Sequence, residues 1–429
     1  MSPTLAEQFS HYVLDGIWQL GNCFSCFPST PSLKINGRSF KILRLLGEGG
    51  FSYVYLVQSP GDPTLYALKK IRCPFGEESV SLALKEVEAY SLFTPHPHII
   101  HAIDHSVETD RGGDAGSKTV YILLPYYRRG NLQDAINANL VNRARFPERR
   151  LMILFLGVCK ALKAMHQYRV KGAPGGESSR RKANKVRQQA QEADREAEEE
   201  VRANQGRRRQ TDDDVEEEPL INSEVMSAQD GIAPGNMRSY AHGDIKPANL
   251  MISDDGTSGI LMDLGSLVPV PRKITSRAAA LAEQDRAAEF CTMPYRAPEL
   301  FDVKTNTSID TKVDIWSLGC TLYACLVGKS PFEARSEETG GSLSLCVLGG
   351  DWHFPDEGPS EAKRGKQRVV DDATTPKRDE VASSAVKNVV RRCLTVEPGE
   401  RPDIDELIAM IEDVISQLPD NGDAALDTE

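Results

Sequence analysis

The sequence contains no uninterrupted apolar run of about 18 residues or more, the length that a membrane-spanning helix needs. Its first residues lack the basic stretch, the apolar stretch and the cleavage site of a secretory signal, so we expect no secretion by that route. A surplus of positive charge is also missing, because 62 acidic residues outnumber 51 basic ones and the net charge is -11. Binding to nucleic acid needs concentrated Lys and Arg, so nucleic acid is not an expected partner.

A disulfide framework is not indicated either. The nine cysteines are an odd number and are scattered through stretches with helix and strand patterns. Reduced thiols and a cytoplasmic location are therefore expected. Hydrophobic residues make up 40% and charged residues 26% of the 429 residues, which is ordinary for a globular protein with one large domain and insertions.

Regular patterns begin near residue 40. Residues 41–46 and 51–57 are strand-like and flank a glycine-rich turn, which predicts a hairpin in a small β-rich lobe. Helical periodicity follows at 80–93 and 151–165, and residues 120–124 form an apolar run of strand length.

Two polar stretches interrupt these patterns, at residues 171–238 and 355–383. The first is rich in Gly, Ser, Gln and charge, a composition that cannot bury a core and predicts disorder. Each doubling of a flexible loop adds only about 0.6 kcal/mol of closure cost. Both stretches are therefore interpreted as insertions that the fold tolerates.

Glycines and a lysine in the first part of the chain suit phosphate binding. The turn from Gly47 to Val54 lets backbone amides close over phosphates, although a plain glycine-rich hairpin explains it equally well. Lys69 ends the next strand pattern after Ala67-Leu68. The following helix places Glu86 to pair with Lys69, and Glu88 is the alternative partner if the helix phase differs.

The strongest signal is the stretch from His242 to Asn249, followed by Asp263-Leu264-Gly265. Phosphoryl transfer needs a carboxylate beside the attacking hydroxyl, a cation near the phosphoryl group and oxygen ligands for a metal. Asp244, Lys246 and the pair Asn249 with Asp263 fit these three requirements. The alternative, that these residues only mark turns, does not account for their joint spacing.

These motifs occur in the order found in the protein kinase family, which the chain resembles from Gly47 to Arg401, over about 355 residues. Ala297-Pro298-Glu299 resembles the end of an activation segment, and the stretch from Asp314 resembles the helix whose Asp steadies the catalytic loop. Three stretches look like the myristoylated and palmitoylated serine/threonine kinase family, near the Numb-associated kinases: residues 47–54, 262–266 and 295–301.

The resemblance implies an α+β, bilobal protein kinase fold with a small β-rich N-lobe and a larger helical C-lobe. The domain would span 39–418, with the N-lobe at about 39–124 and the C-lobe at about 125–418. Residues 1–38 would be an extension and 419–429 a tail. The implied activity is transfer of the γ-phosphoryl group of ATP, with Mg²⁺ or Mn²⁺, to Ser or Thr hydroxyls of a protein substrate.

The resemblance also implies roles for individual residues. Asp244, Lys246 and Thr292 would be catalytic, and Asn249 and Asp263 would bind the metal. Asp314, Glu299 and Arg401 would be structural. The ATP-binding residues would be Gly47, Glu48, Gly49, Gly50, Phe51, Ser52, Val54, Ala67, Lys69, Glu86, Leu124 and Tyr126.

Several positions depart from the common kinase pattern. Gly243 replaces the arginine that grips a phosphorylated activation loop in many kinases, so we expect activity without a loop phosphate. Leu264 replaces a phenylalanine, which changes packing and leaves the metal-binding carboxylate. The Ala-rich stretch 276–288 resembles the helical activation segment of the Numb-associated branch and consists of good helix formers.

The N-terminal arm departs from the family as well. Relatives begin with a glycine for myristoylation, whereas this chain begins Met1-Ser2. Cys23 and Cys26 lie in a stretch that looks like a lipidation segment, so either the start is extended or palmitoylation acts alone; two unmodified cysteines are the alternative. Acylation would give peripheral association with the cytosolic face of Golgi, endosomal or vacuolar membranes and a role in membrane trafficking.

Two other functions are compatible with the sequence. A pseudokinase scaffold would keep the fold without the reaction, but every polar catalytic position is present. A trafficking adaptor would act through the insertion at 171–238, with catalysis secondary.

Overall fold

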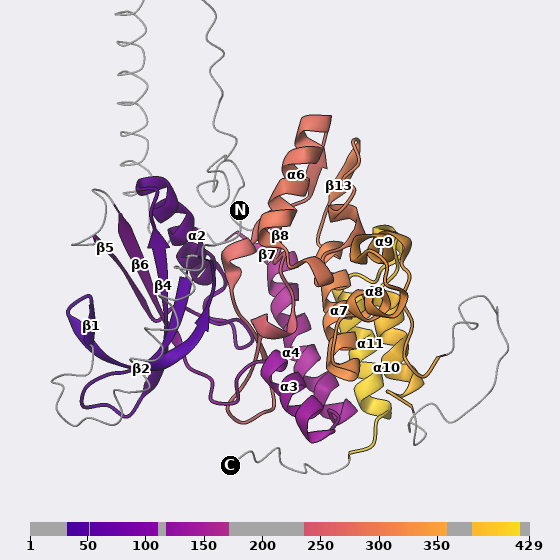
Figure 1. Ribbon diagram of the computed structural model, residues 1–429, viewed down its shortest axis with the longest axis horizontal. Helices are drawn as coiled ribbons and strands as arrows, with labels where there is room; N and C mark the ends of the chain where they lie inside the picture. Colours follow the sequence, from indigo (N-terminus) through magenta and orange to yellow (C-terminus); the bar gives the residue numbers. More distant parts are fainter. Residues whose placement is uncertain (1–31, 51, 110–116, 171–235, 358–379, 421–429) are drawn as a thin grey trace, which may run out of the picture. The chain divides into compact units, whose positions relative to one another are not determined.

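The computed structural model describes residues 32–50, 52–109, 117–170, 236–357 and 380–420 (Figure 1). The chain divides into two compact units between Arg129 and Gly130. The first is mainly β-sheet and the second mainly helical, so the predicted α+β class with a β-rich N-terminal region and a helical C-terminal region is confirmed. In the described ranges, no helix combines the length and the apolar character needed to cross a bilayer.

The first unit is an antiparallel sheet with strand order β1-β2-β3-β4-β6-β5. Helix α2 (Glu77–Phe93) packs against β4 and β6 (Figure 1). The predicted helix at 80–93 therefore starts three residues earlier. The strands are β1 (Ser32–Ile35), β2 (Arg38–Glu48), β3 (Ser52–Gln58), β4 (Leu65–Cys73), β5 (Asp104–Thr109) and β6 (Lys118–Pro125).

The sheet begins inside the segment 1–38 that was expected to be an extension, and that boundary was wrong. Strand β1 pairs with β2 through a tight turn in which Asn36 and Gly37 have φ values of 46° and 81°. Asn-Gly favours this left-handed hairpin turn. Ile35 and Phe40 are completely buried on either side of it. They join a core cluster with Val57, Leu68, Tyr121 and Leu123.

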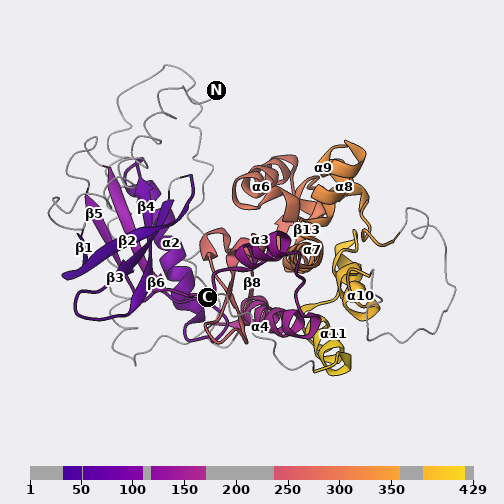
Figure 2. The ribbon, with the colours of Figure 1, turned by 60° about the horizontal axis from the view of Figure 1, so that its bottom comes forward.

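The second unit is built around α7 (Lys312–Val327), in which every residue from Val313 to Cys325 is buried. Helix α4 (Glu148–His166), predicted at 151–165, packs beside α11 (Ile404–Gln417) (Figure 2). The other helices are α3 (Leu132–Asn142), α6 (Arg277–Phe290), α8 (Pro331–Thr339), α9 (Leu343–Gly349) and α10 (Ser384–Cys393).

Short strand pairs connect these helices and support the loops that carry the candidate active site. Strand β8 lies between β7 and β11, β9 pairs with β10, and β12 pairs with β13, all antiparallel. Their bounds are β7 (Tyr168–Arg169), β8 (Met237–Ala241), β9 (Leu250–Ile252), β10 (Gly259–Leu261), β11 (Val268–Val270), β12 (Arg272–Ile274) and β13 (Thr307–Ile309).

The edges of both expected insertions are ordered parts of the fold, which corrects the boundaries 171–238 and 355–383. Arg238 lies in β8 and pairs in register with Tyr168 of β7. At the second insertion, Asp356 accepts hydrogen bonds from the Val381 backbone N–H (2.8 Å) and from Lys387 (2.7 Å). Arg238 and Asp356 are polar, so composition alone grouped these edges with residues 171–235 and 358–379, which lie outside the described ranges.

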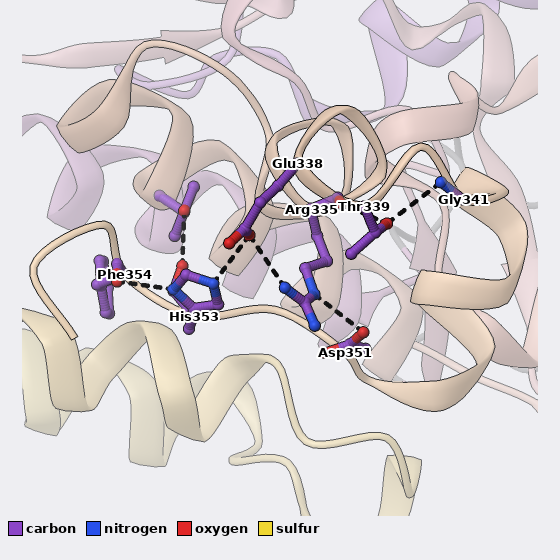
Figure 3. A network of polar contacts seen from close by, with 8 residues as sticks. Arg335, Glu338, Thr339, Gly341, Asp351, His353 and Phe354 are labelled. Atoms are coloured by element: carbon purple, nitrogen blue, oxygen red, sulfur yellow. Dashed lines mark hydrogen bonds and ion pairs between the residues drawn. The ribbon is translucent and has the colours of Figure 1, made fainter. Parts of the chain in front are cut away.

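A polar network fixes the end of α8 to the chain that follows α9 (Figure 3). Arg335 donates to Glu338 and to Asp351, both at 3.0 Å. His353 faces two acceptors, Glu338 through Nε2 (3.0 Å) and the Phe354 carbonyl through Nδ1 (2.9 Å). The hydrogen bonds from Arg335 and His353 lower the pKa of Glu338, which keeps it an acceptor for both.

Candidate active site

The first unit carries an ion pair between β4 and α2. Lys69 Nζ lies 2.8 Å from both carboxylate oxygens of Glu86. Glu86 is only 5% exposed and also accepts a 2.7 Å hydrogen bond from the Tyr90 hydroxyl. Glu88, the alternative partner, is exposed because it is two residues further along the helix and points to another side. The partner of Lys69 is therefore Glu86.

The other residues predicted to bind ATP surround this lysine on the sheet. Lys69 pairs in register with Val54 on one side and Ile122 on the other, and Ala67 pairs with Leu124. Gly49 and Ser52 exchange backbone hydrogen bonds (2.7 and 3.4 Å) that close the turn between β2 and β3. Gly47 and Glu48 end β2, Gly50 lies in the turn, Tyr126 follows β6, and Phe51 lies outside the described residues.

In the second unit, three other predicted site residues meet at Asp244. Lys246 Nζ lies 2.7 Å from Asp244 Oδ2, and the Thr292 backbone N–H donates to Oδ1 (2.9 Å). The Asn249 side-chain amide donates to the Asp244 carbonyl (2.9 Å) and to Oδ2 (3.2 Å). Lys246 also donates to the Thr292 hydroxyl (2.7 Å). Two side chains from the same loop and one backbone N–H from 48 residues away thus hold one carboxylate in a single orientation.

A completely buried carboxylate on α7 holds the backbone of this loop. Asp314 accepts from the backbone N–H groups of His242 (2.8 Å) and Gly243 (2.9 Å) and from the His166 ring (2.9 Å). Burial raises the pKa of Asp314, but the His166 hydrogen bond, the electrostatic effect of both histidines and the Gly243 N–H outweigh burial and leave it below its usual value. Asp314 was predicted for this position; His166 was missed.

The predicted metal ligands Asn249 and Asp263 are linked through neighbouring backbone. The Met262 N–H donates to the Asn249 carbonyl (3.0 Å), and Asp263 follows with φ 60°, in the left-handed region. The Asn249 amide nitrogen faces Asp244, so its side-chain oxygen points the other way. A carboxylate and an amide oxygen suit a hard divalent cation completed by phosphate and water.

No cluster of three or more His, Cys, Asp or Glu suited to a metal occurs in the part of the chain that the structure describes. Leu264 is 2% exposed and packs inside, as expected for a residue with a packing role.

The chain from β11 to Glu299 carries one further strand, β12, the helix α6 and short 3₁₀ turns. Helix α6 is the helix predicted at 276–288, and the Ser276 side chain caps it by accepting from the Ala279 N–H (3.1 Å). Arg401 is 1% exposed and forms two hydrogen bonds with Glu299, at 2.7 and 2.8 Å. Cys23 and Cys26 lie outside the described residues.

Comparison with known proteins agrees with this geometry. Residues 40–171 and 232–410 match the family described as protein kinase domain. The chain is 33% identical to serine/threonine-protein kinase ppk13 of Schizosaccharomyces pombe, covering 89% of this chain and 92% of that one.

Two further relatives carry the same kind of name. Identity is 32% with serine/threonine-protein kinase ENV7 of Saccharomyces cerevisiae (90% and 94% covered) and 28% with human serine/threonine-protein kinase 16 (90% and 94%). With this family match over most of its length, the chain belongs to the protein kinase family and is a serine/threonine protein kinase.

Proposed function

We propose that Asp244 is the catalytic base of this kinase and that Lys246, Asn249, Asp263 and Thr292 complete its phosphoryl-transfer site. The observation that carries the proposal is the convergence of Lys246, Asn249 and Thr292 on the Asp244 carboxylate. Hydrogen bonds from three directions fix its oxygens, and a fixed carboxylate orients a Ser or Thr hydroxyl and accepts its proton.

Each neighbour of Asp244 has its own part in the proposed reaction. Lys246 places a positive charge beside Asp244, where it stabilises charge on the transferring phosphoryl group. Thr292 holds Lys246 and Asp244 together through its hydroxyl and its N–H. Asn249 and Asp263 would hold Mg²⁺ or Mn²⁺, which neutralises phosphate charge when bound. Lys69, fixed by Glu86, would contact the α- and β-phosphates of ATP.

The same proposal includes activity without a phosphate on the activation segment. Gly243 has φ +82°, and a Cβ added to it would lie 3.1 Å from the Ser266 carbonyl oxygen. An arginine at this position would be strained, so a phosphate would have no guanidinium from this residue to pair with.

The test is a transfer assay on the full chain before and after treatment with a phosphatase. We expect transfer from labelled ATP to a basic protein substrate to be unchanged within about 2-fold, well below the 10³-fold scale on which an essential phosphoryl-transfer group acts. Complete loss of transfer after dephosphorylation, regained on re-phosphorylation, would contradict phosphate independence.

We further propose that Cys23 and Cys26 are S-acylated and bring the kinase to the cytosolic face of Golgi, endosomal or vacuolar membranes, in membrane trafficking. The support is the sequence pattern around these two cysteines. Two acyl chains suffice for stable anchoring, whereas one gives only weak, reversible binding. Intact-mass measurement of the natively expressed chain should show two hydroxylamine-sensitive acyl additions that Cys23→Ser with Cys26→Ser removes. An unmodified mass in membrane fractions would refute the proposal.

A further inference from the structure

A buried carboxylate on α6 has no part in the reaction described above. Glu283 is 1% exposed, and its two oxygens face two different arginines. Oε2 lies 2.6 Å from Arg272 Nη2, and Oε1 accepts from Arg286 through Nε (3.1 Å) and Nη2 (2.6 Å). A carboxylate this deeply buried and doubly paired is costly to desolvate, so its position between two guanidinium groups requires a reason.

The two arginines come from different parts of the activation segment. Arg272 lies in β12, before α6, and Arg286 lies in the last turns of α6. Glu283 therefore fastens the strand that enters the segment to the helix that follows. Gln284 adds a link from α6 to the Phe301 carbonyl (3.0 Å), beyond the Ala-Pro-Glu motif.

The end of α6 leads directly to the candidate catalytic residues. Two residues after Phe290, the Thr292 N–H donates to Asp244 and the Thr292 hydroxyl accepts from Lys246. Between Phe290 and Thr292, the Cys291 carbonyl accepts a hydrogen bond from Arg296 (2.8 Å). The position of α6 therefore sets where Thr292 meets Asp244.

Two guanidinium groups that converge on one anion are the arrangement with which proteins grip a phosphate. We propose that Glu283 is a positioning residue that occupies the place of a regulatory phosphate, holding the activation segment so that Thr292 reaches Asp244. This inference rests on the proposed role of Asp244. The Glu283 carboxylate would be the internal anion that makes an added phosphate unnecessary.

The test compares Glu283→Gln with Glu289→Gln in the full chain. Glu289 lies on the same helix but is exposed, so its variant controls for the same chemical change outside the network. We expect Glu283→Gln to lower kcat toward a basic protein substrate by up to about 100-fold, as misplacement by about 1 Å can do. KM for ATP should stay within about 2-fold, because Lys69 and Glu86 are untouched, and Glu289→Gln should match the unsubstituted chain.

The variant Arg272→Gln keeps the proposal testable if Glu283→Gln does not fold. It leaves Glu283 paired with Arg286, so the protein should stay folded while the link to β12 is lost. We expect a smaller decrease in kcat, about 10-fold, again with KM for ATP unchanged. Native kcat in both folded variants, or a loss that follows the folded fraction alone, would overturn the role of Glu283.

The outcomes also separate this inference from the proposed function. If Asp244→Asn kept full turnover, the catalytic assignment would fail whatever Glu283 does. If dephosphorylated kinase and Glu283→Gln were both fully active, only the role of Glu283 would be lost.

Discussion

Asp244→Asn is expected to lower kcat by about 10²–10⁴-fold, the usual contribution of a general base, while ATP binding is retained. The amide cannot take up the hydroxyl proton. It also disturbs its own neighbours, since Asp244 accepts at both oxygens: from Thr292 at Oδ1, and from Lys246 and Asn249 at Oδ2. An amide has one acceptor oxygen, so its NH₂ group must face a donor.

The measurement pairs steady-state transfer from labelled ATP with nucleotide binding followed by fluorescence. Asp302→Asn is the matched control, because Asp302 is an exposed carboxylate of the same unit. Full turnover by Asp244→Asn would show that another group accepts the proton. Parallel loss of turnover and ATP binding would point to a structural role instead.

Short motifs explain why much of this site could be predicted from sequence. Asp244, Lys246 and Asn249 lie within six residues on one loop and its 3₁₀ turn, so their spacing alone brings them together. Thr292 is 48 residues from Asp244, and its contact was expected only from the resemblance to kinases. The Lys69–Glu86 pair was expected from the resemblance of the strand ending at Lys69 to a kinase strand, and the phase of the following helix decided between Glu86 and Glu88.

The residues that sequence reasoning missed are those whose role depends on distant partners. His166 ends a helix that was predicted correctly, but its partner Asp314 is 148 residues away. Glu283 lies in an Ala-rich helix where a charged residue is expected to face water, and only the positions of Arg272 and Arg286 explain its burial. No local pattern in one sequence encodes such pairings.

The start of the sheet was missed despite a readable signal. Asn36-Gly37 separates two short alternating segments, which is a strong hairpin indication. The apolar residues before it have near-helical spacing, so the boundary between extension and domain was placed at residue 38. Ile35 and Phe40 are buried against residues of β3, β4 and β6, and this packing fixes β1 in the sheet. These contacts join residues far apart in sequence, so a local pattern does not show them.

Asp314→Asn is expected to have the largest effect on stability. Three donors converge on the Asp314 carboxylate, two at Oδ2 and one at Oδ1. An amide presents an NH₂ group to at least one of them, so a buried donor loses its acceptor. Each buried group left unsatisfied costs about 1–3 kcal/mol, and we expect the free energy of unfolding to fall by about 3 kcal/mol. Turnover should fall with it, because His242 and Gly243 lead into Asp244.

The stability that the Asp314 carboxylate contributes should decrease at low pH. The pKa of Asp314 is lowered in the folded state from its ordinary value of 3.8, so the unfolded chain binds the proton more readily. The stability from Asp314 is therefore fully present above pH 3.8 and is lost as pH falls through the folded-state pKa. Urea unfolding should be measured at pH 7 and at decreasing pH for the unsubstituted chain and for Asp314→Asn. The gap between their free energies of unfolding should narrow below about pH 4. Asp302→Asn should show no gap. A gap that stays constant down to acid unfolding would mean that the ionised carboxylate is not what holds the catalytic loop.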